Sequence, residues 1–399
     1  ISIGILLFFR LLFLNYASRL KNIYLTKDSD HYIELSNDIS YSFFNDNLYN
    51  YWISSFRMPG YPLILNIFQN VFDINLAIFL NFIADSITLW MVYKILQKYF
   101  NKKIAYIGCV LFLINPNLLI SSSQIMTESI STTLFFAAFY FFDEKKYVFT
   151  GISIGFLGVI KPLGHYLLCL YLILLILKKN KSIKNYLKIS IFPIIFIGSI
   201  FLNNFIQYES TFYSTSNYFH LQWLNEASKS LCNDGDFSNP NVSEPGYVFE
   251  NWLEENKLNI NSRSEILINK LKYDASNEIL DNLHCKAYSM ARSSVWNMFG
   301  IRRASWGEVG LNFVLLNLVL MFSLIYVAFM NLSFIISAFK SIKNRTLDIT
   351  LLIVIIYMII ISTLPFGNSR TRVLIEPFLL IVFIDVAKGF ISNKLNTGR

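Results

Sequence analysis

Long apolar runs alternate with short polar segments along almost the whole chain. A bilayer core about 30 Å thick needs roughly 20 apolar residues per helix, so the runs predict about ten transmembrane helices and an all-α polytopic membrane protein. Two adjacent runs, 147–160 and 163–178, are shorter and are separated by Lys161 and Pro162. They indicate two helices hinged at the outer surface, with one bent helix as the alternative. The expected helices cover residues 1–20, 74–97, 104–121, 126–142, 147–160, 163–178, 187–207, 311–338, 349–365 and 372–390.

The basic residues between these runs indicate which helix ends are cytoplasmic. All the clusters fall on one side of the membrane if ten helices alternate in direction, and that side is cytoplasmic by the positive-inside rule. Merging 147–178 into one helix would place Lys340 and Lys388 on the opposite side. The N-terminus is therefore expected inside, and the segments 21–73 and 208–310 outside. The clusters are Lys98, Lys102 and Lys103; Lys145 and Lys146; Lys178, Lys179, Lys181 and Lys184; Lys340, Lys343 and Arg345; and Lys388, Lys394 and Arg399.

This topology divides the chain into three parts. Residues 1–207 are expected to form an N-terminal transmembrane module, and its external loop 21–73 carries the candidate catalytic residues. Residues 208–310 form a large extracytoplasmic loop, and 311–399 form the C-terminal transmembrane helices. Within the first external loop, the apolar stretch 59–72 is too short to cross a bilayer, which predicts an interfacial or re-entrant helix.

The large extracytoplasmic loop has two features of an ordered segment. Ser262 and Glu265 have the spacing of a capping box, which starts an amphipathic helix here. Cys232 and Cys285 are the cysteines outside the predicted spans, and they lie in a compartment that is commonly oxidising. The sequence is compatible both with a disulfide between them and with two buried thiols.

The composition agrees with a membrane protein. Of the 399 residues, 54% are hydrophobic and 15% are charged, whereas a soluble domain usually carries about 25% charged residues. Mean hydropathy is +0.46. The net charge of +8 comes from clusters between apolar runs, which argues against nucleic acid as a partner. The first run lacks a basic start and contains Arg10, so we interpret it as a transmembrane helix rather than a signal peptide. Because the chain begins with Ile1, further residues are expected before it.

Charged and polar side chains gather at the predicted outer ends of the helices. They are Asp28, Asp30, His31 and Arg57 in the first loop; Thr127 and Glu128 after a break at Asn115–Pro116–Asn117; Lys161 and His165 in the hinge; and Arg370 and Arg372 before the last helix. Charges are expensive to remove from water at a membrane. A lipid-phosphate substrate would need such a set. Its phosphate requires cations, preferably arginine, and an acceptor hydroxyl requires a carboxylate to take its proton.

Several of these residues also have a structural explanation. Asp28 and Asp30 offer hard oxygen ligands, two residues apart, for Mg²⁺ or Mn²⁺, but either acid is also typical of a solvated surface. Glu128 at a helix start complements the helix dipole. Lys161 is the kind of side chain that extends to lipid headgroups, and so are the external arginines. Arg10 is expected either to face the interior of the bundle or to reach the headgroups.

The order of these motifs resembles the GT-C superfamily of membrane glycosyltransferases, closest to the protein O-mannosyltransferases and the bacterial aminoarabinose and lipopolysaccharide-core sugar transferases. Asp28 to Tyr32 is similar to the acidic motif of the family's first external loop, with Ser29 in place of the usual Glu. Arg57 to Pro62 is similar to its Arg-Pro-Pro-Gly-Tyr-Pro element, with Met58 in place of one Pro. The resemblance spans nearly the whole chain except most of 209–300. Further similar elements are Pro116 with Thr127 and Glu128, Gly155 and Gly158 with Lys161 and Pro162, and Arg370 and Arg372 with Pro377.

The resemblance implies a GT-C-like fold with an extracytoplasmic loop insertion. It also implies an inverting transfer of a hexose or pentose from a polyprenyl-phosphate-linked sugar to a lipid, glycan or protein acceptor. We predict Asp28 as the general base, and Arg370 and Arg372 as the clamps of the donor phosphate. Further donor contacts are expected at His31, Arg57 and Lys161, other candidates are Asp30, Glu128 and Tyr32, and a divalent cation, if one is used, would bind Asp28 and Asp30.

The expected location is a membrane, with the bacterial inner membrane as the predicted one and the site facing the periplasm or exterior. Two other functions stay open. A lipid-linked glycan polymerase or ligase would use the same face with different acceptors. A secondary transporter would place broken helices and polar residues near the membrane midplane, often in inverted repeats, whereas here the candidate charges gather at one outer face and no repeat is visible.

Overall fold

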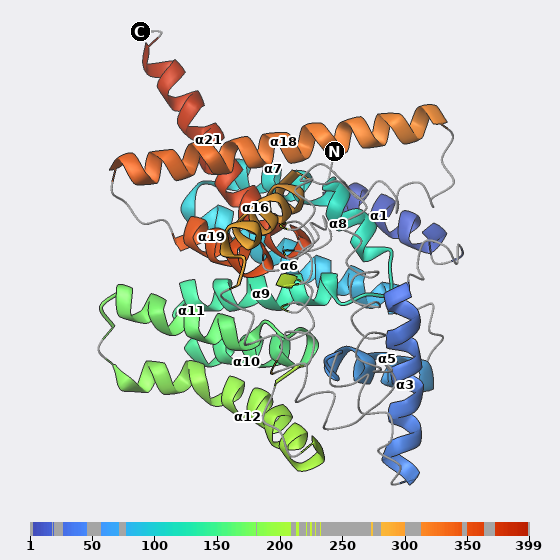
Figure 1. Cartoon of the computed structure of the whole chain (residues 1–399). Helices are drawn as coiled ribbons and strands as arrows, with labels where there is room; N and C mark the ends of the chain where they lie inside the picture. Colours follow the sequence, from blue (N-terminus) through green and yellow to red (C-terminus); the bar gives the residue numbers. More distant parts are fainter. Residues whose placement is uncertain are drawn as a thin grey trace.

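The computed structural model of the chain is a bundle of α-helices (Figure 1). It describes residues 3–17, 19, 27–45, 57–71, 77–180, 182–208, 213–214, 221, 224–225, 228, 232, 273, 281–299, 313–344, 349–362 and 372–397. These residues contain no strand, so the all-α class is confirmed for this part of the chain. The elements are α1 (Ile3–Ala17), α3 (Lys27–Asn45), α5 (Gly60–Val71), α6 (Ala77–Tyr99), α7 (Lys102–Leu113), α8 (Pro116–Ser122), α9 (Glu128–Asp143), α10 (Tyr147–Ile160), α11 (Gly164–Leu177), α12 (Ile183–Tyr208), α16 (Leu283–Phe299), α18 (Phe313–Asn344), α19 (Ile349–Ser362), the 3-10 turn η3 (Val373–Ile375) and α21 (Glu376–Thr397).

Every apolar run expected from the sequence contains helix. The run 104–121 is divided into α7 and α8, which are bent by 55° at the break before Pro116. The run 147–178 forms two helices, α10 and α11, and not one bent helix. Within the described ranges, α6, α12 and α18 are the 3 helices long and apolar enough to cross a membrane, and the bent pair α7 and α8 raises this number to 4. The ten crossings therefore stay a prediction.

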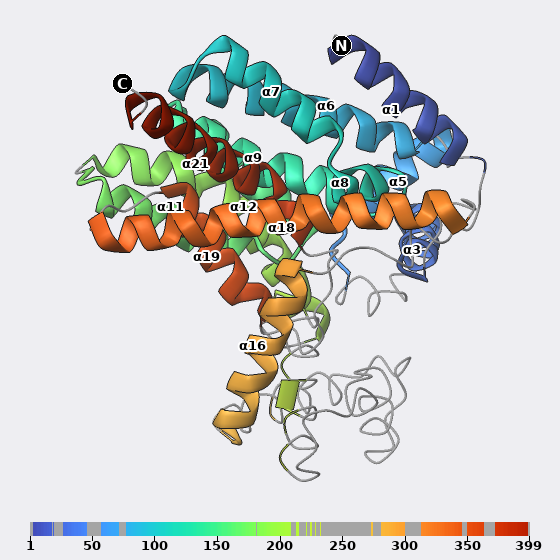
Figure 2. The same cartoon turned by 90° about the horizontal axis from the view of Figure 1, so that it is seen from above.

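The main core joins the N-terminal helices to the C-terminal ones. α10 packs against both α9 and α12, and α6 packs against α7 and α9. Phe378 of α21 packs against Phe135, Phe136 and Phe139 of α9, with ring centroids 5.1, 5.1 and 5.3 Å apart. Aromatic rings bury a large apolar area, so this contact holds the start of α21 against α9. The long α18 crosses the bundle and packs on α21 (Figure 2).

The segment 21–73, which was predicted to be an external loop, contains the helices α3 and α5. α3 begins at Lys27, so the motif from Asp28 to Tyr32 forms the start of a helix. Asp28 and Asp30 occupy its first turn, where negative charge complements the helix dipole and helps a polar sequence to start a helix. The stretch 59–72 is helical as expected and forms α5, which packs against α3. Figure 1 shows α3 running across the direction of α9 to α12.

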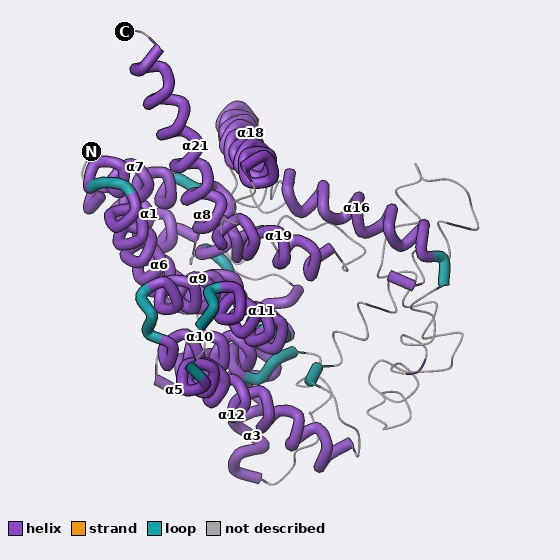
Figure 3. The backbone as a smooth tube through the Cα atoms, turned by 90° about the vertical axis from the view of Figure 1, so that its left-hand side faces the viewer, coloured by secondary structure: helices purple, strands orange, loops and turns teal. Residues whose placement is uncertain are grey.

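One helix from residues 208–310, the segment predicted to be an extracytoplasmic loop, is described. α16 extends away from the other helices (Figures 2 and 3) and contacts α18 and α19. Its first turn carries Cys285, which is bonded to Cys232, so of the two alternatives open in the sequence the structure has the disulfide. The capping box at Ser262 and Glu265 lies outside the described residues.

We expect peptide mapping under non-reducing conditions to recover Cys232 and Cys285 in one cross-linked species. The two cysteines are 53 residues apart, and closing such a loop stabilises a protein by about 4 kcal/mol in the chain-entropy account. Replacing both by serine should therefore lower the thermal stability of the chain in detergent. Cys169→Ser is the control, because this thiol is free and exposed. Recovery of both thiols in alkylated form without reduction would contradict the bond.

Candidate functional site

The start of α3, the start of α5 and the residues just before α5 bring together an acid, a cation and two aromatic rings. Arg57 forms an ion pair with Asp28, and its guanidinium lies 5.2 Å from the ring centroid of Tyr32. Tyr61 packs edge-on against Tyr32 with the ring centroids 5.1 Å apart. Because the ion pair and the cation–π contact restrict the same guanidinium, Arg57 holds the Asp28 carboxylate in one orientation. Both charged side chains remain partly accessible to solvent.

The position of Arg57 depends on a close approach between two segments. A Cβ atom at Gly60 would lie 2.6 Å from the carbonyl oxygen of Val159, near the end of α10. A side chain at this position would force the two backbones apart, so glycine is required. The contact places the segment that carries Arg57 beside the end of α10, next to Lys161.

A second charged pair lies where α10 ends. Lys161 Nζ is 3.1 Å from Glu128 Oε1. Glu128 is the first residue of α9 and is buried, whereas Lys161 lies in the turn between α10 and α11 and is partly accessible. Glu128 therefore complements the α9 dipole, as its position in the sequence suggests, and Lys161 provides the opposite charge that a buried carboxylate requires.

The two charged pairs lie in one region of the protein. Tyr32 and Tyr61, which accompany the first pair, share a hydrophobic cluster with Ile125 and Ile160. These two isoleucines lie within three residues of the members of the second pair. The region therefore combines residues from α3, from the segment before α5, from the start of α9 and from the hinge after α10. We name it the outer charged region, after the side of the membrane predicted for these helix ends.

Arg372 is not in an open turn, as its place before the last helix suggests, but inside the protein. Its side chain is 0% exposed, and so is that of Glu376, one helical turn later. Arg372 Nε donates to Glu376 Oε1 at 2.6 Å, and Arg372 Nη1 donates to Asn331 Oδ1 of α18 at 2.8 Å. A buried cation is costly unless it is paired and hydrogen-bonded, so Glu376 and Asn331 explain how this arginine can be buried.

Two asparagines at the α7–α8 break extend this arrangement. Asn115 Nδ2 donates to Glu376 Oε2 at 2.9 Å, and Asn117 Nδ2 donates to Glu376 Oε1 at 2.8 Å. We name Arg372, Glu376, Asn331, Asn115 and Asn117 the buried arginine cluster. Its η3 turn packs against α9, the helix whose first residue belongs to the second charged pair.

Three of the residues predicted for the site are not part of either charged pair or of the buried arginine cluster as described: Asp30, His31 and Arg370. Asp30 and His31 are exposed on the first turn of α3. Residues two apart on a helix point in different directions, and Asp28 is paired with Arg57. A joint metal site at Asp28 and Asp30 would need a change in this arrangement, and it stays a prediction. Arg370 lies outside the described residues.

One group in the described part of the chain has the spacing of a metal site. The ligand atoms of Cys232, His284 and Cys285 lie within 4.8 Å of one another, and His284 Nε2 is 3.4 Å from Cys232 Sγ. The two sulfur atoms are bonded to each other, however. Metals bind the thiolate form of cysteine, so we assign this group as a disulfide with a neighbouring histidine.

The acids that pair with the buried arginines were not among the candidates from the sequence. Asp85 and Glu376 lie in predicted spans, and an ionisable residue there is itself a signal because it is costly to bury. Arg10, for which the sequence allowed two positions, faces the interior and pairs with Asp85. Nothing in the sequence distinguishes Asn331 from the other polar residues of a long apolar helix.

We expect replacement of Lys161 to destabilise the protein more than replacement of its partner Glu128. Lys161→Met should destabilise the protein by about 3 kcal/mol, because it leaves the buried Glu128 carboxylate without its cation. Glu128→Gln should cost clearly less, because the partly accessible lysine can extend to water. Thermal unfolding in detergent compares the two variants, and equal losses would show that the burial of Glu128 does not govern the pair.

The sequence was compared with known proteins. Residues 57–201 match the model of the dolichyl-phosphate-mannose-protein mannosyltransferase family. This is a GT-C family of glycosyltransferases that use a polyprenyl-phosphate-linked sugar, so the resemblance inferred from the motifs is confirmed over the matched segment. The segment contains Arg57, Glu128 and Lys161, whereas Asp28 and Arg372 lie outside it. Neither a curated protein nor a solved structure matches the chain.

Proposed function

We propose, starting from the match of residues 57–201 to the mannosyltransferase family, that this chain transfers a sugar from a polyprenyl-phosphate-linked donor to a lipid, glycan or protein acceptor. The reaction would take place at the extracytoplasmic face of a bacterial inner membrane. This is the side on which the predicted ten-helix topology places the outer charged region. The observation that carries the proposal is that three charged residues of the matched segment lie in the outer charged region together with Asp28, the acid expected from the sequence.

In the proposed reaction, Asp28 takes the proton of the acceptor hydroxyl. The acceptor oxygen forms a bond to the anomeric carbon of the sugar while the bond between that carbon and the phosphate oxygen breaks. A single displacement of this kind inverts the anomeric carbon, and the polyprenyl phosphate leaves with the electron pair. The ion pair with Arg57 supports this role because a base must be held within hydrogen-bond distance of the proton that it removes.

The leaving phosphate needs positive charge more than it needs a proton. Lys161 and Arg57 are the partly accessible cations of the outer charged region, and we propose both, with His31 and Arg370, as donor contacts. Arg372 is proposed as the principal phosphate clamp. Its pairing with Glu376 means that a donor phosphate would have to replace this carboxylate at one face of the guanidinium.

Two observations favour a second candidate function. The break between α7 and α8 and the buried Arg10–Asp85 pair are features that secondary transporters also have. The family match and the charges of the outer charged region favour the transferase, which is why transport is second. A lipid-linked glycan polymerase or ligase would use the same donor chemistry with another acceptor.

The test uses the full chain reconstituted in liposomes. The donor is a polyprenyl phosphate carrying radiolabelled mannose, and a membrane extract supplies acceptors. We expect label to move from the lipid into an acceptor fraction with the wild type and not with Asp28→Asn. Label that stays on the lipid while free sugars or other solutes cross the same vesicles would reject the transferase in favour of transport.

A further inference from the structure

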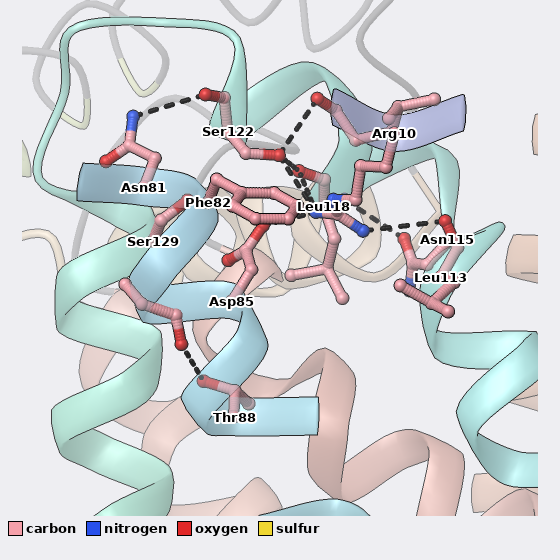
Figure 4. Close-up of polar contacts among 12 residues, drawn as sticks. Arg10, Asn81, Phe82, Asp85, Thr88, Leu113, Asn115, Leu118, Ser122 and Ser129 are labelled. Carbon is pink, nitrogen blue, oxygen red and sulfur yellow. Dashed lines mark hydrogen bonds and ion pairs between the residues drawn. The ribbon is translucent and has the colours of Figure 1, made fainter. Parts of the chain in front are cut away.

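The proposed transfer reaction leaves one buried ion pair unexplained. Arg10 of α1 and Asp85 of α6 are each 3% exposed and form a direct ion pair. Figure 4 shows the two side chains meeting beside the α7–α8 break. Charges in apolar helices are costly, and a buried ion pair is not by itself a gain in stability. Their presence here indicates a role other than packing.

The guanidinium of Arg10 reaches the N-terminal side of this break. The backbone N–H of Asn117 donates to Asn115 Oδ1 at 2.9 Å and not to a helical carbonyl. The carbonyl of Leu113, at the end of α7, therefore loses its usual donor four residues later. Arg10 Nη1 lies 3.5 Å from this oxygen and provides the replacement.

Arg10 also reaches the C-terminal side of the break. Its Nη2 atom lies 3.3 Å from the carbonyl oxygen of Leu118 and 2.8 Å from Ser122 Oγ. Asn81 of α6 adds two hydrogen bonds, from Nδ2 to the carbonyls of Ser122 and Gln124, at 3.3 and 2.7 Å. One guanidinium therefore contacts both helices across the 55° bend, and α6 holds the end of α8 in place.

The short helix α8 connects this ion pair to the buried arginine cluster. Ser122 at the end of α8 contacts Arg10. At the other end, Asn115 and Asn117 donate to Glu376, the partner of Arg372. The helix has only 7 residues, so a shift at one end moves the other.

We propose that Arg10 and Asp85 are positioning residues for Arg372. Their ion pair holds the α7–α8 break in the geometry in which Asn115 and Asn117 hold Glu376, and Glu376 in turn holds Arg372. This role rests on the proposed function, in which Arg372 binds the donor phosphate. It requires a guanidinium, because the ammonium of lysine lacks the fork that reaches two carbonyls and a carboxylate at once.

The experiment separates the position of α8 from the stability of the protein. The test variant is Arg10→Met with Asp85→Val, which removes both charges, because replacing a whole buried ion pair by apolar residues is often neutral for stability. Arg10→Lys is the second variant and keeps the charge pair. The control is Thr88→Val, which removes another buried polar contact of α6, the 2.9 Å hydrogen bond to Thr133 of α9, away from α8.

Two quantities are measured for each variant in detergent. Amide hydrogen exchange over residues 114–122 reports on the break directly. Binding of a polyprenyl monophosphate reports on Arg372. We expect faster exchange over 114–122 and binding weakened by about 5–150-fold, the usual range for coupled sites, in the double variant. Arg10→Lys should fall between the double variant and the wild type, and Thr88→Val should match the wild type.

The outcomes distinguish this inference from the proposed function. Unchanged exchange over 114–122 in both Arg10 variants would overturn the clamp at the break, whatever the chain binds. Faster exchange with unchanged binding of the polyprenyl phosphate would overturn the link to Arg372. A wild type that does not bind the polyprenyl phosphate would contradict the proposed function and the positioning role with it, while the exchange result would still decide whether the pair clamps α8.

Discussion

Replacing Asp28 by asparagine is expected to lower the rate of sugar transfer by about 10²–10⁴-fold, the contribution typical of a general base. Asparagine has nearly the same shape but cannot accept the proton of the acceptor hydroxyl. Since Arg57 keeps its contact with the Tyr32 ring, the site should stay folded and the affinity for the donor should change little. Turnover of the labelled lipid donor by the purified chain measures the effect.

Asp30→Asn is the matched control for this variant. It removes the same charge from the same turn of α3, but at an exposed position. We expect its transfer rate to remain close to that of the wild type. A similar loss in both variants would indicate that the negative charge of the helix start matters and not the base. Near-normal turnover in Asp28→Asn would remove Asp28 from the mechanism.

Replacing Arg372 by alanine is expected to have two effects. It should destabilise the protein by about 3–5 kcal/mol, because it leaves the carboxylate of Glu376 buried without its cation. It should also strongly weaken binding of the polyprenyl phosphate if Arg372 is the donor clamp. Arg372→Lys should recover only part of either effect, since lysine cannot donate in two directions from a rigid plane.

A double variant separates these two effects. Arg372→Met with Glu376→Gln removes both charges, and the glutamine oxygen can still accept from Asn115 or Asn117. Its thermal stability should lie close to that of the wild type, whereas binding of the polyprenyl phosphate should remain weak. If the double variant binds the lipid phosphate as the wild type does, Arg372 is a structural residue of the core and not a donor contact.

Much of the helical framework could be predicted from local sequence patterns. Each expected helix coincides with an apolar run of the sequence. A helix in a large core or in a membrane has apolar residues on all its faces, so its sequence is apolar throughout. Lys161 and Pro162 marked the separation of α10 from α11, since proline cannot continue a helix in the usual way. Asn115 to Asn117 marked the break before α8 for the same reason.

The motif from Asp28 to Tyr32 shows where such patterns stop being informative. Its sequence is polar and has few apolar positions, so it suggested a loop, whereas the structure has the helix α3. Helix formation here depends on acids in the first turn and on packing of α3 against α5. The pairing of Asp28 with Arg57, 29 residues later, depends on the same packing.

By itself, the sequence determined the helical class, the positions of the apolar helices and the set of charged residues at their ends, because these depend on residue type and local spacing. The tertiary structure decided which charges meet. It placed Arg57 on Asp28 and Lys161 on Glu128, and it buried Arg372 with Glu376 and Arg10 with Asp85. Most of these partners come from segments that are far apart in the sequence. Arg372 and Glu376 are close in sequence, but their burial depends on the asparagines of a distant break. Their pairing follows from the packing of the helices and cannot be predicted from the local sequence.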